Sequence, residues 1–302
     1  MTSSIHPTVR LNKYQKIRGK WNKRTYTIVR LIGEGARGSI YLALLSQQYV
    51  ALKISQDSSV VSAEVNALKM LKKVQGQSLG PLLLDVDDVV LGHQTVYAFY
   101  VMEYIDGVPL NTWVKQEGLQ WLFPASQQLL SQLHQLHNLG HIFGDLKPEN
   151  ILVDRKSKQV RLVDVGGVTP FGRSIREYTT WYDRGYWKLG DRRAEPSYDL
   201  FAYAVCLLSM DPHIKIQQMK SKDIEKVIQS ATSLKPLHAV IRHALHGEFD
   251  TAVEMKHAIE QVNQKQLKVS QTKTSKSNFK MELMGVGTIV TIHFALLYYF
   301  IW

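Results

Sequence analysis

Residues 141–150, HIFGDLKPEN, bring a carboxylate, an amine and an amide close together in the chain. Asp145 and Asn150 have the spacing D-x-x-x-x-N, and Lys147 lies between them. A carboxylate placed this way could accept the proton of a substrate hydroxyl. The amide could hold Mg²⁺, and the amine could neutralise a moving phosphoryl group. Further along, Asp164 begins the motif DVG, where a carboxylate at the end of a strand would bind the ions that bridge nucleotide phosphates.

A second motif, GEGARGSI, offers a place for the phosphates themselves. Gly33, Gly35 and Gly38 match G-x-G-x-x-G, and Ile40 fills the branched apolar position that follows. Dinucleotide-binding folds use the same spacing, but there a helix begins at the glycines. Strand-like residues flank the glycines on both sides here, which favours a hairpin whose backbone N–H groups cover phosphates.

A lysine and a glutamate complete the set of candidate residues. Lys53 lies in the strand-like run VALKI, and Glu64 follows it on a predicted helix. A lysine in that strand can pair with the α- and β-phosphates of a nucleotide when a carboxylate holds it in place. Two ordinary surface charges are the alternative, but the distance from the glycine-rich motif favours the functional interpretation.

The elements that must position these residues change in character along the chain. Strand-like runs dominate the first third around one helix, and helices dominate from residue 125 onward. This order predicts an α+β fold of two lobes with a cleft between them, a β-rich lobe over 22–104 and an α-rich lobe over 105–262.

Composition and charge narrow the function classes. The chain has 302 residues, 45% of them hydrophobic, and a net charge of +11. Residues 1–33 and 263–280 are basic and contain no Asp or Glu, so they could bind anionic lipid or DNA, or form a solvated arm over 1–21 and a linker over 263–282. The single cysteine, Cys206, excludes an internal disulfide, and its apolar surroundings predict a core thiol.

The last twenty residues, 283–302, contain no Lys, Arg, Asp or Glu. About twenty apolar residues in a helix span a bilayer core. Tyr298, Tyr299 and Trp302 suit the far interface, and the lysines before the run predict that the larger part of the chain stays in the cytoplasm. We therefore expect a single C-terminal transmembrane helix in the cell membrane; a buried C-terminal helix is the alternative.

In their order and spacing, these motifs resemble those of Hanks-type Ser/Thr protein kinases over residues 22–262. The resemblance implies a bilobal protein-kinase fold that uses ATP and Mg²⁺. It implies that Met102 is the gatekeeper beside the adenine pocket and that Glu103 to Ile105 offer hinge backbone groups to adenine. It also implies that Asp199 braces the catalytic loop and that Thr179 contacts the catalytic Asp and Lys.

A narrower resemblance rests on GDLKPEN, DVGG, EYTTWYDRGYW and AEPSYDLFA together with the uncharged C-terminal run 283–302. These stretches are similar to those of the membrane-anchored, sporulation-associated kinases of Bacillus and its relatives. That resemblance implies a cytoplasmic kinase domain in a spore-forming bacterium and a response to DNA. Self-association for phosphorylation in trans would follow if the basic segments concentrate the enzyme.

Several positions depart from the family pattern. Phe143 and Gly144 stand where the catalytic loop normally has His and Arg, and Val165 replaces the Phe of D-F-G. In the family, that Arg binds a phosphate on the activation segment, and Gly144 has no side chain that could bind one. In the family, the Glu of an A-P-E motif pairs with an Arg late in the helical lobe. Here the A-P-E motif is absent, and HGEFDTAVEM, where that Arg is expected, contains none. We therefore expect that this ion pair was lost as a unit and replaced by another structural device, with no buried charge left unpaired.

None of these departures removes a group that would touch ATP, Mg²⁺ or the phosphoryl group. The sequence therefore predicts an active Ser/Thr protein kinase acting on protein hydroxyls. The alternative is a membrane-tethered pseudokinase that serves as a nucleotide-binding scaffold.

Overall fold

The computed structural model describes residues 9–35, 37–72, 79–92, 94–218 and 223–268. The chain divides into two units, 1–256 and 257–302, and in the second unit residues 257–268 are helical. The predicted membrane segment 283–302 and most of the predicted linker lie outside the described residues. Among the helices that the structure does describe, none is long and apolar enough to cross a membrane.

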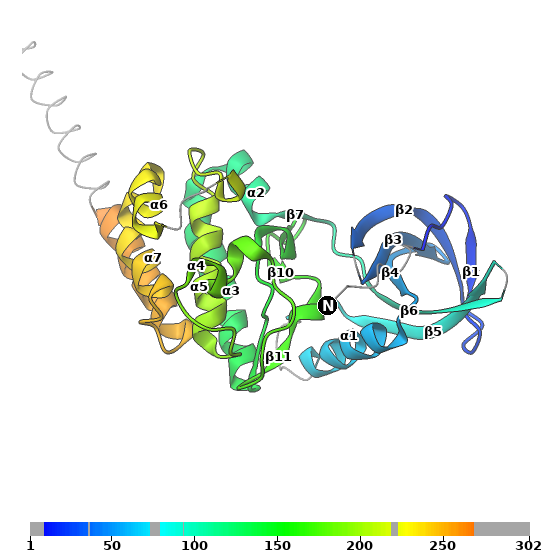
Figure 1. Ribbon diagram of the computed structural model, residues 1–302. Helices are drawn as coiled ribbons and strands as arrows, with labels where there is room; N and C mark the ends of the chain where they lie inside the picture. Colours follow the sequence, from blue (N-terminus) through cyan, green and yellow to red (C-terminus); the bar gives the residue numbers. More distant parts are fainter. Residues whose placement is uncertain (1–8, 36, 73–78, 93, 219–222, 269–302) are drawn as a thin grey trace, which may run out of the picture. The chain divides into compact units, whose positions relative to one another are not determined.

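The first lobe is built on an antiparallel sheet, drawn in blue and cyan in Figure 1. Within the described residues it has six strands in the order β1-β2-β3-β4-β6-β5. They are β1 (Lys16–Arg18), β2 (Thr25–Gly35), β3 (Gly38–Leu45), β4 (Gln48–Ser55), β5 (Leu83–Leu91) and β6 (Thr95–Glu103). The glycine-rich motif lies at the turn between β2 and β3, so it forms the predicted hairpin and not the start of a helix.

The basic segment that precedes the predicted first lobe takes part in its core. Val9, Leu11 and Ile17 are buried against the sheet, and β1 pairs with β2. The Tyr41 hydroxyl donates to the carbonyl of Val9 and accepts from the backbone N–H of Leu11. The predicted boundary between an arm over 1–21 and the lobe is therefore too late, because apolar residues between the basic ones are drawn into the core.

Helix α1 (Ser58–Leu71) lies against β4, β5 and β6 of this sheet (Figure 1). It begins at Asp57, whose carboxylate accepts a hydrogen bond from the backbone N–H of Ser59. Its buried residues follow the i, i+3, i+4 spacing of one helical face: Val61, Glu64, Val65, Leu68 and Leu71. One of them is charged, so the helix carries a carboxylate into the interior of the lobe.

The second lobe is mostly helical and is drawn in green to orange in Figure 1. Its helices are α2 (Leu110–Glu117), α3 (Leu122–Asn138), α4 (Arg184–Trp187), α5 (Pro196–Ser209), α6 (Ile224–Ser230) and α7 (His238–Leu245), and residues 252–256 are helical as well. Its short strands are β7 (Gly107–Pro109), β8 (His141–Ile142), β9 (Ile151–Asp154), β10 (Val160–Leu162) and β11 (Thr169–Pro170). The β9–β10 hairpin follows the catalytic loop and leads into Asp164.

Helix α5 is the most buried helix of this lobe, with every residue from Tyr198 to Leu208 inside. A helix that is apolar all round is expected in the middle of a core. Cys206 lies within it, and burial raises the pKa of its thiol well above the ordinary value. The predicted core thiol is confirmed, and so is the predicted division into a strand-rich and a helical lobe.

Candidate active site

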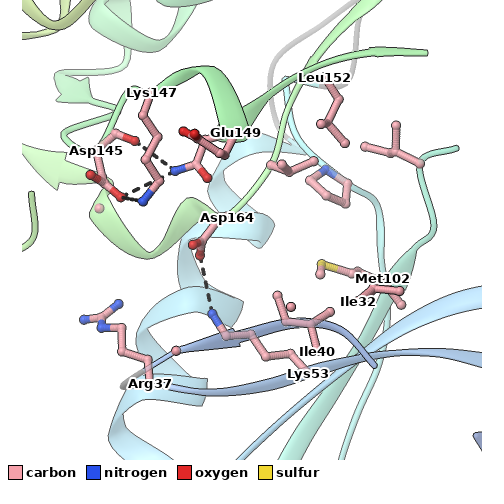
Figure 2. Close-up of a pocket in the computed structure, with 18 of the residues that line it drawn as sticks. Ile32, Arg37, Ile40, Lys53, Met102, Asp145, Lys147, Glu149, Leu152 and Asp164 are labelled. Carbon is pink, nitrogen blue, oxygen red and sulfur yellow. Dashed lines mark hydrogen bonds and ion pairs between the residues drawn. The ribbon is translucent and has the colours of Figure 1, made fainter. Parts of the chain in front are cut away.

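A cavity of about 1070 Å³ lies between the glycine-rich hairpin and the catalytic loop (Figure 2). Ligand pockets of proteins commonly reach this size. Its apolar lining includes Ile32, Ala51, Met102 and Leu152. The predicted site residues that line it are Gly33, Gly35, Gly38, Ile40, Lys53, Glu103, Ile105, Asp145, Lys147, Asn150 and Asp164. Glu64 lies behind Lys53, outside this lining.

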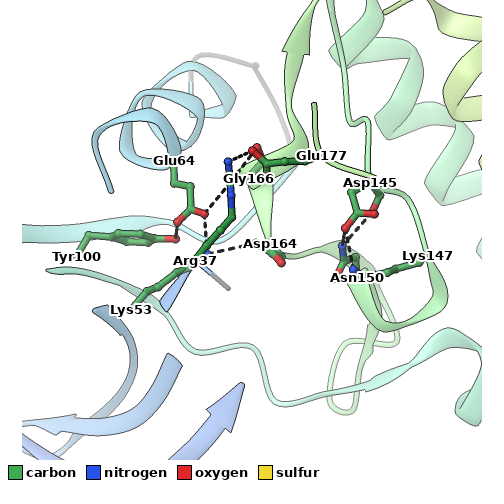
Figure 3. Close-up of polar contacts among 10 residues, drawn as sticks. All are labelled: Arg37, Lys53, Glu64, Tyr100, Asp145, Lys147, Asn150, Asp164, Gly166 and Glu177. Carbon is green, nitrogen blue, oxygen red and sulfur yellow. Dashed lines mark hydrogen bonds and ion pairs between the residues drawn. The ribbon is translucent and has the colours of Figure 1, made fainter. Parts of the chain in front are cut away.

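The first charged group of the site is the lysine cluster, formed by Lys53, Glu64 and Tyr100. Lys53 Nζ lies 2.6 Å from Glu64 Oε1, and the Tyr100 hydroxyl donates to Glu64 Oε2 at 3.0 Å (Figure 3). Lys53 and Tyr100 are cross-strand partners in β4 and β6, which places both near α1. Burial, and then the Glu64 charge, raise the pKa of the Tyr100 phenol well above its usual value.

Lys53 also reaches toward the other side of the cavity. Its Nζ lies 3.4 Å from Asp164 Oδ1, as the dashed line in Figure 2 marks. Asp164 has a left-handed backbone with φ +59°, a conformation that costs free energy in residues other than Gly and clusters at functional sites. The lysine is thus held by a buried carboxylate on one side and lies near a more exposed one on the other.

The second charged group is the loop cluster, formed by Asp145, Lys147, Asn150 and Thr179. Lys147 Nζ lies 2.7 Å from Asp145 Oδ2, and the Thr179 hydroxyl donates to Asp145 Oδ1 at 2.8 Å. Lys147 also donates to Thr179 Oγ1 at 3.0 Å, so the predicted contacts of Thr179 with both residues are confirmed. Asn150 donates to the backbone carbonyl of Asp145 at 2.9 Å, which fixes the loop that carries the carboxylate.

A buried carboxylate supports the loop from below. Asp199, in α5, is fully buried and accepts hydrogen bonds from the backbone N–H groups of Phe143 and Gly144 at 2.8 and 2.9 Å. This is the brace that the sequence predicted. The ring of His137 adds a bond to the same carboxylate at 3.0 Å, a contact that the sequence did not reveal. Phe143 is itself buried where the family has its loop histidine, and a histidine of α3 supplies a side-chain bond.

The backbone at residue 144 explains why a glycine stands there. Its φ is +81°, in the region that favours glycine. A Cβ at this position would overlap the carbonyl oxygen of Gly167, which follows the DVG motif. The catalytic loop and the segment after the DVG motif therefore approach each other backbone to backbone, and a side chain at residue 144 would separate them.

The region of the missing A-P-E motif is held by ion pairs that the sequence analysis overlooked. Asp183 is fully buried; it lies 2.6 Å from Arg192 and accepts a hydrogen bond from the Tyr198 hydroxyl at 3.0 Å. Its carboxylate also caps α4. Arg184, on the next position, pairs with Glu195 at 2.7 Å. Local ion pairs thus take the place of the family's ion pair, as the sequence predicted.

The hinge residues divide their roles between side chain and backbone. The Glu103 carboxylate accepts from Arg161 at 2.8 and 3.1 Å, which ties the hinge to β10. Its side chain is thereby occupied, and its backbone N–H donates to the carbonyl of Leu82 at 2.8 Å. The backbone carbonyl of Ile105 accepts from Gly107 at 2.9 Å, which shapes the turn into β7.

The candidate metal ligands suit Mg²⁺ that arrives with a nucleotide. Asn150 and Asp164 both line the cavity, and the Asp164 carboxylate is partly exposed to it. Within the described residues no group of three or more His, Cys, Asp or Glu side chains could hold a metal ion. Mg²⁺ is usually bound by one or two carboxylates together with substrate phosphates, so these residues fit a shared site.

The fold and the site together define a protein kinase. The protein kinase domain family matches residues 26–281, and the chain belongs to this family. More narrowly, the chain is 42% identical over 252 residues to the Serine/threonine-protein kinase YabT of Bacillus subtilis (strain 168). That alignment covers 82% of this chain and 75% of the relative. The chain is therefore a bacterial Hanks-type Ser/Thr protein kinase, as the motifs predicted.

More distant relatives share parts of the chain. Cell division control protein 2 homolog 2 of Trypanosoma brucei brucei is 28% identical over 201 residues, which cover 62% of this chain and 56% of that protein. The solved structure of vaccinia related kinase 3 has a TM-score of 0.63 and 16% identity, and the likeness covers 87% of this chain and 94% of that one. At this identity the likeness supports the bilobal fold alone.

Proposed function

We propose that this kinase transfers the γ-phosphoryl of Mg²⁺-bound ATP to Ser and Thr hydroxyls from the cytoplasmic face of the cell membrane in a spore-forming bacterium. The observation that carries the chemistry is the loop cluster, in which Lys147 and Thr179 hold both oxygens of the Asp145 carboxylate. A hydroxyl brought to this carboxylate would lose its proton to it.

The other residues have distinct tasks in this proposal. Lys53, fixed by Glu64, orients the α- and β-phosphates, and the glycine-rich hairpin covers them with backbone N–H groups. Asn150 and Asp164 would hold Mg²⁺, which neutralises charge on the phosphates when bound. Lys147 stabilises charge on the phosphoryl group as it moves. Most of the catalysis is therefore positioning and electrostatic stabilisation.

The decisive test is the Asp145→Asn variant in a ³²P-transfer assay with a generic protein substrate. General-base catalysis contributes about 10²- to 10⁴-fold, so we expect kcat to fall by about 10³-fold while ATP still raises the melting temperature. The wild-type enzyme, assayed with and without Mg²⁺, is the control. Equal activity in the variant would remove Asp145 from the mechanism, and ATP binding without transfer by the wild type would favour the pseudokinase.

The membrane part of the proposal rests on the uncharged run 283–302 and the lysines before it. Expression of the full chain and of a variant ending at residue 282 in a Bacillus host, followed by fractionation, tests it. We expect the full chain in the membrane fraction and the shortened chain in the supernatant. Spore counts of a strain lacking the kinase, complemented with wild type or Asp145→Asn, test the link to sporulation.

The proposed response to a polyanion, either DNA or anionic lipid, rests on the basic segments. In the described part of the first segment, Lys13 lies 4.8 Å from the ring of Tyr14, and Lys20 lies 4.7 Å from the ring of Trp21. Both rings are exposed, so each offers an aromatic face beside a charge. Kinase assays of the full chain with duplex DNA or phosphatidylserine vesicles should show activation that weakens steeply with salt. Activity that responds to neither would refute this part.

A further inference from the structure

Arg37, at the tip of the glycine-rich hairpin, makes contacts that its position on the chain does not predict. Its guanidinium is in contact with the Glu177 carboxylate and lies 3.4 Å from Glu64 Oε1 (Figure 3). It also donates to the backbone carbonyl of Gly166 at 3.3 Å. One side chain of the first lobe thus joins α1, the DVG motif and the segment that follows it.

The partner Glu177 belongs to the activation segment, which we define as residues 167–182. Two positions after Glu177, Thr179 bonds to Asp145 and to Lys147. A tie at Glu177 therefore restrains the backbone that carries Thr179. Both members of the Arg37–Glu177 pair are about one-third exposed, so the pair is neither deeply buried nor freely solvated.

The catalytic loop, residues 141–150, contains no arginine that could order this segment, because residue 144 is glycine. We propose that Arg37 is a positioning residue that orders the activation segment through the Glu177 carboxylate, so that Thr179 stays on Asp145 without phosphorylation of the segment. Glu177 supplies permanently the negative charge that a phosphate would add. The inference rests on the kinase activity of the chain.

The direction of the effect follows from where the pair lies. Arg37 turns toward α1 and Gly166, while the apolar end of the cavity, where adenine would lie, is lined by Met102 and Leu152 (Figure 2). Arg37 and Glu177 themselves line this cavity, which has a volume of about 1070 Å³ with the pair in place. The pair therefore supports the site and leaves room for the nucleotide, so breaking it should lower kcat and leave the KM for ATP nearly unchanged.

The test is a double-mutant cycle on the full chain in detergent, with Arg37→Gln, Glu177→Gln and the double variant. A displaced catalytic group costs up to about a hundredfold, so we expect each single change to lower kcat about tenfold. If the two residues act through one contact, the double variant falls about tenfold as well and not about a hundredfold. Arg37→Lys, which keeps the charge, should retain most of the activity.

Two controls complete the design. Arg173→Gln removes an exposed charge from the same segment and should leave kcat unchanged. Wild-type enzyme treated with a phosphatase, with its phosphorylation state read by mass spectrometry, should keep its kcat. Any one of the following results would overturn the inference: higher activity in the single variants, a double variant whose loss is the product of the two single losses, a raised KM for ATP in Arg37→Gln alone, or inactivation by the phosphatase. An inactive wild type would instead count against the kinase activity itself.

Discussion

The lysine cluster and the loop cluster serve the same reaction but are built in opposite ways. In the lysine cluster, the Lys53 and Glu64 side chains are 6% and 1% exposed. In the loop cluster, the Lys147 and Asp145 side chains are 23% and 15% exposed. The first is a finished ion pair inside the protein, whereas the second is an arrangement that a substrate can reach.

The two clusters therefore have different roles. A buried ion pair leaves a costly charge behind when one partner is removed, so its members are tied to the stability of the fold. A pair that is partly exposed is screened more by water and contributes less to stability than a buried pair. The lysine cluster is therefore part of the scaffold as well as of the site, while the loop cluster is free to serve the chemistry.

Replacing the lysine of each cluster by methionine tests these two roles. Lys53→Met leaves the Glu64 charge buried without its lysine, so the free energy of unfolding should fall by about 3 kcal/mol. Lys147→Met should lower the free energy of unfolding by no more than about 1 kcal/mol. In both variants kcat/KM should fall about a hundredfold, because each substitution removes a positive charge that would stabilise the phosphates. Urea titrations and transfer assays of the two proteins measure this, and equal stability losses would contradict it.

A second experiment probes how closely the loop cluster is held to the DVG segment. Gly140 and Gly144 both have positive φ, +73° and +81°, but only Gly144 faces a neighbouring backbone oxygen. Gly140→Ala therefore measures the cost of the backbone conformation alone. Gly144→Ala adds the overlap with Gly167 and should be about 2 kcal/mol less stable than Gly140→Ala. Thermal unfolding of both variants checks it, and equal melting temperatures would show that the approach is loose.

The parts of the site that the sequence predicted are those set by short spacings. The spacing D-x-K-x-x-N places Asp145, Lys147 and Asn150 within six consecutive residues, so their proximity depends little on the rest of the fold. Predicting the Lys53–Glu64 pair needed one further inference, from the strand that carries the lysine to the helix that follows it. The fold class followed in the same way, from runs of strand-like and helical residues.

The parts that escaped prediction depend on partners with no fixed spacing. Strand β5 reads LLDVDDVVL, which is acidic for a strand. Burial alone would raise the pKa of the Asp87 carboxyl, but the backbone N–H groups of Trp21 and Asn22 donate to it and bring the pKa below its usual value. The Asp183–Arg192 pair escaped similarly, because nothing in an irregular segment indicates which charges meet.

A substitution in the activation segment tests how far the orientation of the Asp145 carboxylate depends on Thr179, and we expect the smallest change here. Thr179→Val removes a hydroxyl that donates to Asp145 and accepts from Lys147, and it keeps the branched shape of the side chain. Thr180→Val changes the neighbouring, exposed threonine in the same way and serves as the control. Because Asp145 keeps its lysine, the carboxylate loses orientation but not charge, and kcat should fall about tenfold with the melting temperature nearly unchanged. If Thr180→Val fell equally, the segment as a whole would matter and not the hydroxyl. If neither fell, Lys147 alone would suffice to orient the carboxylate.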